Sequence, residues 1–296
     1  MIDFKRRELR FKLIEEGIAG AEKADLSRIN FALQHSHEQY LLETAKYILA
    51  YKEYKNNDFP AALSHLEEAI KLDPTFMAAH LLKGSVLIHK GELDEAIRSI
   101  DYSIQNLQLM HYSVFYGNKG VALDRMGRFD EAISCFLRGI EDDTNYDKNY
   151  INCLLTFCKK GDWFNALSLS EQIREVFKEN PEILNWTTTQ LLNLAERTLK
   201  EGNPGISEKF VEEAGKQLDL AVMKEPENAS ILYNLACVYS RRNKTNEAIE
   251  TLKKAIEKMD SDDKKKMYRE MAYKDVDFAN IRVNPLFKEI VLSGDS

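Results

Sequence analysis

A fourteen-residue pattern occurs twice in this chain, 36 residues apart. The stretches GELDEAIRSIDYSI (91–104) and GRFDEAISCFLRGI (127–140) share a glycine, the tetrapeptide Asp-Glu-Ala-Ile and a final isoleucine at the same offsets. The alanine of this pattern recurs at spacings of 34, 36, 34, 48 and 34 residues, as Ala62, Ala96, Ala132, Ala166, Ala214 and Ala248. A period near 34 residues indicates stacked helix–turn–helix units, each of which buries its apolar face only against its neighbours.

The positions around this frame alanine repeat as well. Four residues after it stand Leu66, Ile100, Phe136, Ser170, Leu218 and Leu252, and three further on stand Ala69, Ser103, Gly139, Ile173, Ala221 and Ala255. Spacings of four and three place these residues on one face of a helix. Twelve residues before the alanine the chain carries a small residue, at Ala50, Gly84, Gly120 and Ala236. We therefore predict two helices per unit that cross closely at these small residues.

The pattern resembles the tetratricopeptide repeat family. The segments that carry the resemblance are Asp-Glu-Ala-Ile at 94–97 and 130–133, Asn-Glu-Ala-Ile at 246–249, and LEEAIKLDP at 66–74. The 147–180 repeat departs from the family, because Leu154 stands where a small residue is typical and Ser170 where a large one is. The resemblance implies an all-α, right-handed solenoid of about six helical hairpins with helical caps.

The repeat frame also predicts a domain organisation. Residues 1–42 precede the frame and are interpreted as an N-terminal helical cap, with a self-association or docking helix as the alternative. Residues 43–262 form the solenoid, in which the 48-residue step predicts an elongated hairpin at about 182–223, either a tolerated insertion or a docking arm. Residues 263–296 resemble the closing unit of bacterial proteins of this family, and we expect four side chains to pack on the last hairpin: Phe278, Ile281, Leu286 and Phe287.

The overall charge favours a protein partner. The net charge of −7 and the pI near 5.6 give no long-range attraction to nucleic acid or to an anionic membrane. No run approaches about 18 apolar residues, so we expect no insertion into a membrane. The four cysteines show no paired framework, which suits a reducing compartment, and the charged start has no apolar stretch typical of a secretory signal. These features predict a cytoplasmic protein.

No catalytic, metal or cofactor motif is recognisable. The six histidines lack a partner at metal-binding spacing, and Cys153 and Cys158 are five residues apart on one predicted helix, so their side chains diverge. Phosphate-binding glycine loops and a nucleophile elbow are absent from the sequence. We predict a non-enzymatic chain without a metal or cofactor.

The first helix of each hairpin lines the inner surface in this family, and its residues are therefore the candidates for binding. Asparagine recurs there at one frame position, two residues before the small one, as Asn118, Asn152 and Asn234. An amide both donates and accepts hydrogen bonds, so a row of asparagines could hold the backbone of an extended peptide. The alternative is that these amides bond between helices. The other predicted peptide-binding residues are Tyr47, Tyr51, Leu81, Ser85 and Arg241, although the tyrosines could instead belong to a half-buried core.

The family's carboxylate clamp, which binds the acidic C-terminus of chaperones, is not present in the matching register. Tyr47 and Tyr51 occupy its lysine and asparagine positions. The remaining three positions hold Leu82, Val114 and Asn118. The sequence thus predicts an adaptor or scaffold that binds a protein or peptide other than such a tail. The alternative is a structural subunit that assembles or docks through its end caps or long hairpin.

Overall fold

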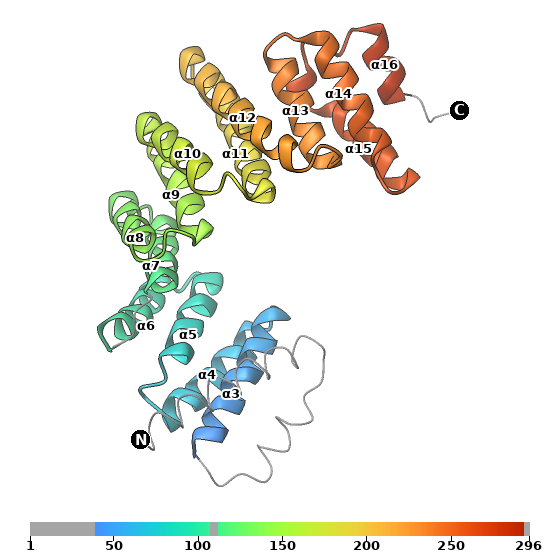
Figure 1. Cartoon of the computed structure of the whole chain (residues 1–296). Coiled ribbons are helices and arrows are strands. Elements are labelled where there is room, and N and C mark those ends of the chain that lie inside the picture. The colour runs from blue at the N-terminus through green and yellow to red at the C-terminus, as the bar shows by residue number, and fades with distance from the viewer. Residues whose placement is uncertain (1–38, 107–111, 293–296) are drawn as a thin grey trace. The chain divides into compact units, whose positions relative to one another are not determined.

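A computed structural model describes residues 39–106 and 112–292, and all of their regular elements are helical (Figure 1). The chain divides into two compact units, residues 1–153 and residues 154–296, which are considered separately below. Six successive helix pairs, α3–α4 to α13–α14, are followed by two further α-helices and a 3₁₀ turn. This confirms the predicted all-α solenoid of about six hairpins. Most of the predicted N-terminal cap lies outside the described residues.

The first unit contains three complete hairpins. Their helices are α3 (Gln39–Lys55) with α4 (Phe59–Leu72), α5 (Met77–Lys90) with α6 (Leu93–Asn106), and α7 (Ser113–Arg125) with α8 (Phe129–Asp142); α9 (Asp147–Lys160) crosses the boundary between the units. Local sequence sets the ends of these helices. Asp58 caps α4 by accepting a hydrogen bond from the backbone N–H of Ala61, and Gly91, with φ of 83°, ends α5 in the left-handed conformation.

The hairpins cross closely where the frame predicts it. All six frame alanines are fully buried. A Cβ atom added to Gly84 would lie 2.5 Å from Cγ1 of Ile100, and one added to Gly120 would lie 2.5 Å from a ring carbon of Phe136. The small residue before the frame alanine therefore faces the large residue four positions after it. This pairing is the physical reason for two of the recurring positions in the sequence.

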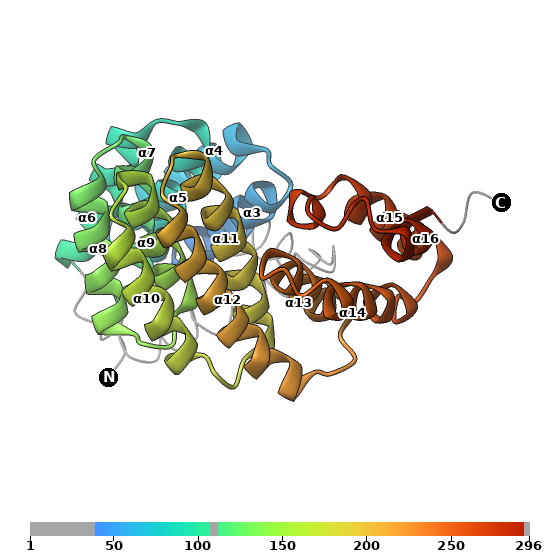
Figure 2. The ribbon, with the colours of Figure 1, turned by 90° about the horizontal axis from the view of Figure 1, so that it is seen from above.

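The second unit contains the longest helices. It comprises the end of α9, then α10 (Trp163–Val176), α11 (Pro181–Lys200), α12 (Pro204–Lys224), α13 (Ala229–Arg241), α14 (Thr245–Glu257), α15 (Asp262–Lys274), the 3₁₀ turn η1 (Val276–Phe278) and α16 (Pro285–Leu292). Helices α11 and α12 have 20 and 21 residues, whereas α13 and α14 have 13 each. They run side by side as one pair (Figure 2), which confirms the predicted elongated hairpin.

The C-terminal elements bury most of the side chains that we expected to pack there. Phe278, Ile281 and Phe287 are buried, and the rings of Phe278 and Phe287 lie 5.5 Å apart. The expectation for Leu286 is wrong, because 57% of its surface is exposed. Adjacent helical residues point about 100° apart, and on α16 the buried face belongs to Phe287 and Val291.

Candidate functional site

The first helices of the three hairpins in the first unit each carry partly exposed residues among the predicted binding positions. Tyr47 and Tyr51 lie one turn apart on α3, Leu81 and Ser85 lie one turn apart on α5, and Asn118 lies on α7. All five side chains are neither fully buried nor fully exposed. The structure therefore places polar, aromatic and aliphatic groups on three successive inner helices.

The two tyrosines among these residues belong partly to the core. Tyr47 and Tyr51 both pack against the cluster that contains Ala50 and Leu66, and the Tyr47 ring lies 5.3 Å from the ring of Phe76. Burial, with a smaller contribution from Tyr51, raises the pKa of Tyr47 to about 12. The hydroxyl of Tyr47 is therefore a neutral hydrogen-bonding group at physiological pH. The rings of Tyr47 and Tyr51 lie at the border of the core.

Asn118 connects two hairpins. Its Nδ2 donates to Oγ of Ser85 at 2.9 Å, and the Ser85 hydroxyl in turn donates to the carbonyl oxygen of Leu81 at 3.1 Å. The amide N–H groups of Asn118 are thus directed to α5, whereas its Oδ1 has no hydrogen-bond donor among the described residues. Asn152, at the same frame position in α9, is also partly exposed.

Asn234 makes the corresponding connection in the second unit. Its Nδ2 lies 2.8 Å from Oδ1 of Asn185 and 3.1 Å from Oγ1 of Thr189, so α13 is linked to α11. The bonding between helices that the sequence left open as an alternative is therefore present at Asn118 and Asn234. Peptide binding by these amides stays a prediction, in which the carbonyl oxygen is the available group.

Arg241 has a different environment from the other candidates. Its guanidinium forms an ion pair with Asp277 of η1, and the two side chains are only 13% and 10% exposed. Burial raises the pKa of Asp277 above its ordinary value, although the charge of Arg241 opposes this. Tyr233 donates a hydrogen bond to Oδ2 of Asp275 at 2.8 Å. These contacts attach the C-terminal elements to α13, a role that the sequence did not predict for Arg241.

Three potential metal ligands meet next to this ion pair. The thiol of Cys237 and the carboxylates of Asp275 and Asp277 lie within 4.8 Å of one another. Both carboxylates already accept hydrogen bonds from protein side chains, and burial together with the two nearby carboxylates raises the pKa of the Cys237 thiol well above its ordinary value. Because a metal requires the thiolate, this arrangement favours a structural polar network.

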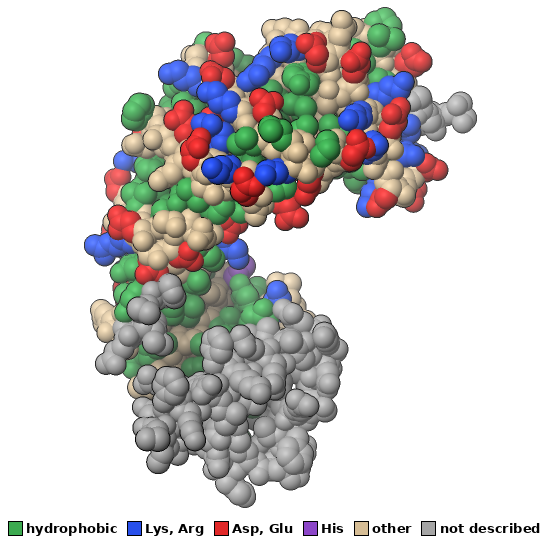
Figure 3. Space-filling model, viewed as in Figure 1, with side chains coloured by type: hydrophobic (Ala, Val, Ile, Leu, Met, Phe, Trp, Pro, Cys, Tyr) green, Lys and Arg blue, Asp and Glu red, His purple; other side chains and the backbone are tan. Residues whose placement is uncertain are grey.

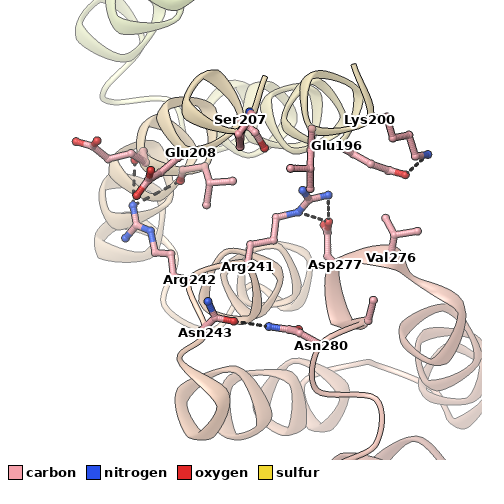
Figure 4. A pocket seen from close by; sticks show the side chains of 15 residues that line it. Glu196, Lys200, Ser207, Glu208, Arg241, Arg242, Asn243, Val276, Asp277 and Asn280 are labelled. Carbon is pink, nitrogen blue, oxygen red and sulfur yellow. Dashed lines mark hydrogen bonds and ion pairs between the residues drawn. The ribbon is translucent and has the colours of Figure 1, made fainter. Parts of the chain in front are cut away.

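A cleft of about 930 Å³ lies between the tip of the long hairpin and the C-terminal elements (Figure 4). Helices α11 and α12 exceed α13 by about two turns, and residues from the tip of their hairpin form one side of the cleft. Leu199 on α11 and Val276 in η1 line the cleft and are 54% and 50% exposed, and the Arg241–Asp277 pair is also part of its lining. The sequence predicted the long hairpin but not this cleft, although the unequal helix lengths were a signal for it.

The visible surface of the second unit carries charges of both signs. Lys and Arg side chains are interspersed with Asp and Glu over α11–α16 (Figure 3). Within residues 39–106 and 112–292, no helix combines the length and the apolar character required to cross a membrane.

Comparison with known sequences identifies the repeat. Family models of the tetratricopeptide repeat match residues 49–106, 114–143 and 229–257. Among curated proteins, the DnaJ homolog subfamily C member 7 homolog of Dictyostelium discoideum is 25% identical over 281 residues, covering 84% of this chain and 49% of that protein. Hsp70-Hsp90 organizing protein 1 of Glycine max is 23% identical, covering 69% of this chain and 33% of that protein. The chain thus spans half or less of the length of these relatives.

Solved structures support the fold. The Naa15/Naa10 complex bound to HypK-THB contains a chain that superposes with a TM-score of 0.67 at 15% identity, covering 97% of this chain and 54% of that one. The PilF protein of Pseudomonas aeruginosa superposes with a TM-score of 0.54 at 16% identity, covering 82% of this chain and 98% of that one. The 34-residue frame, the stacked hairpins and the family matches together show that the chain contains tetratricopeptide repeats.

Proposed function

We propose that this chain is a non-enzymatic interaction adaptor that binds an extended segment of a protein across the inner helices α3, α5 and α7. The observation that supports the proposal is the partial exposure of five residues on three successive first helices: Tyr47, Tyr51, Leu81, Ser85 and Asn118. Aromatic side chains supply much of the energy at binding surfaces, and polar groups between them fix orientation. Relatives named for Hsp70 and Hsp90 support a protein as the class of partner.

The partner differs from an acidic chaperone tail bound by the family's clamp. At the two clamp positions of the first inner helix, the half-buried rings of Tyr47 and Tyr51 replace lysine and asparagine. At a third position, the side chain of Leu82 is buried. Oδ1 of Asn118 instead accepts a hydrogen bond from a backbone N–H of the bound segment. This acceptor is indifferent to the side chains of the segment, which suits an adaptor for extended peptides.

The double variant Asn118→Ala, Asn152→Ala is expected to weaken binding of a peptide to the inner helices by about tenfold or more. Each lost hydrogen bond costs about 0.5–1.5 kcal/mol, and about 1.4 kcal/mol corresponds to a factor of ten. The peptide is selected from a random display library on the full chain, and its affinity is measured by calorimetric titration.

Asn106→Ala, Asn165→Ala is the matched control for this variant. It makes the same change at two exposed asparagines on α6 and α10, outside the residues proposed to bind the peptide. We expect this control to leave the affinity within a factor of two or so, because the hydrogen bonds that it removes lie within the protein. Unchanged affinity in a folded Asn118→Ala, Asn152→Ala variant would exclude Asn118 and Asn152 as peptide-binding residues.

The cleft beside the long hairpin supports a second candidate function, that of a structural subunit. Leu199 and Val276 expose apolar surface on two sides of this cleft, and burial of such surface stabilises association. Light scattering on the purified chain separates the two functions. A discrete monomer at micromolar concentration supports the adaptor, and a dimer or larger species that Leu199→Asp dissociates supports assembly through the cleft.

A further inference from the structure

A basic side chain occupies the same frame position in three successive inner helices. Five residues after Ala50, Gly84 and Gly120 stand Lys55, His89 and Arg125, in the last turns of α3, α5 and α7. All three residues are exposed. They are called the cationic cluster below. The shared position follows from the repeat, since residues at one frame position of neighbouring hairpins lie side by side.

Contacts of neighbouring residues link the ends of these three helices. Nε2 of His89 lies 3.0 Å from the hydroxyl oxygen of Tyr54, which precedes Lys55. The His89 ring stacks on Phe59, with centroids 5.4 Å apart and an angle of 18° between the planes. Nη1 of Arg125 donates to the carbonyl oxygen of Ile88 at 2.6 Å, which brings the guanidinium of α7 to the end of α5.

Among residues 39–106 and 112–292, no carboxylate forms an ion pair with Lys55 or Arg125 of the cationic cluster. Burial raises the pKa of Tyr54, and both Lys55 and Arg125 oppose this rise, so the fields of both cations reach the same hydroxyl. Within the described parts of the chain, neither Lys55 nor Arg125 has a carboxylate oxygen within 4.0 Å, whereas Lys90 is paired with Glu92 at 2.7 Å. The negative end of a helix accounts for one favourable cation per helix. It does not account for the contact of His89 with Tyr54 of α3, or for that of Arg125 with the end of α5.

We propose that the cationic cluster binds acidic side chains of the peptide that occupies the inner face. This inference rests on the proposed function and adds a sequence preference to it. A carboxylate is the complementary group, because Arg125 retains N–H donors beyond its single bond to Ile88, and Nζ of Lys55, 5.8 Å from the centre of the Tyr51 ring, has no ion pair among the described residues. Tyr54 and Phe59 flank the cluster and would exclude water from one side of the bound carboxylate.

The test uses peptides selected from a random twelve-residue display library on the full chain. The selected peptides are expected to be enriched in Asp and Glu. They should bind the variant Lys55→Gln, Arg125→Gln about tenfold more weakly or worse, because this variant loses the charge-assisted hydrogen bonds to their carboxylates. The variant Lys55→Arg, Arg125→Lys keeps both charges and is expected to retain most of the affinity. Lys71→Gln, Arg98→Gln makes the same change of charge on α4 and α6 and should leave the affinity unchanged.

Comparison of the variants separates failure of this inference from failure of the proposed function. The inference is overturned if the peptides show no acidic enrichment, or if they bind the Lys55→Gln, Arg125→Gln variant as tightly as the wild type. In that case the proposed function still stands if the Asn118→Ala, Asn152→Ala variant binds the same peptides more weakly. Peptides that neither variant weakens overturn both, as does a library without binders. Peptides synthesised with an amidated C-terminus should bind equally well, because internal carboxylates are the ligands, and a loss of binding on amidation would overturn the inference in favour of a terminal carboxylate.

Discussion

The variant Arg241→Ala is expected to lose about 3–5 kcal/mol of unfolding free energy at pH 7, because it leaves a nearly buried carboxylate without its cation. Arg241 contacts Asp277 through Nε and Nη2, and both side chains are almost inaccessible to water. Asp277 is part of η1, whose Phe278 is fully buried. The loss should therefore appear in the C-terminal elements. Urea unfolding followed by circular dichroism measures it, and amide hydrogen exchange locates it.

The pH dependence of this loss has a defined sign. Burial already raises the pKa of Asp277 above its ordinary value, and removal of Arg241 raises it further. A carboxyl group whose pKa is higher in the folded protein stabilises the fold most when protonated, and this contribution is lost as the pH rises through the folded pKa. The loss of unfolding free energy in Arg241→Ala, relative to the wild type, should accordingly be largest near neutral pH and become smaller in acid.

Asp277→Asn is the matched second variant. In the Arg241→Ala background it removes the unpaired charge, so the double variant should be more stable at pH 7 than Arg241→Ala alone. Two results would show that the ion pair does not hold the C-terminal elements. One is a loss of unfolding free energy in Arg241→Ala that stays constant between about pH 4 and pH 8, and the other is a double variant whose loss equals the sum of the two single losses.

The fold could be predicted from the sequence because the hairpins repeat one pattern of small and large residues. The frame alanines, the preceding small residues and the long step at the elongated hairpin are local patterns, and each has its counterpart in the structure. Stacking of near-identical units requires no further information. Leu286 shows the limit of this reasoning within one helix, because a pattern of apolar residues does not decide which of two adjacent ones faces the core.

The candidate sites were less predictable, because they depend on contacts between different elements. The frame placed Asn118 and Asn234 on inner helices, but not their hydrogen bonds to Ser85 and Asn185. Arg241 appeared from its position to be a groove residue, yet Asp277, 36 positions along the chain, determines its environment. The basic residues of the cationic cluster recur in the frame, but only the contacts of Tyr54 with His89 and of Arg125 with Ile88 link the ends of the three helices.

Leu154→Ala is expected to lower the unfolding free energy by about 2–5 kcal/mol, as truncation of a fully buried leucine does. In two earlier hairpins, the small residue twelve positions before the frame alanine lies against the large residue four positions after it. These pairs are Gly84 with Ile100 and Gly120 with Phe136. In the α9–α10 hairpin the sizes at these positions are exchanged, since Leu154 and Ser170 occupy them and both have no exposed surface. By analogy with those hairpins, we predict that Leu154 and Ser170 form a compensated pair, in which a large residue packs against a small one.

The exchange predicts a specific coupling between these two positions. Ser170→Leu alone should overpack the contact with Leu154 and cost about 1–3 kcal/mol. Combined with Leu154→Ala, the same change should restore the arrangement of the other hairpins, so that the double variant is more stable than the sum of the single losses predicts. Chemical denaturation of the wild type, both single variants and the double variant measures this coupling. Purely additive losses would show that Leu154 and Ser170 are buried independently, and that the small-against-large contact does not extend to α9–α10.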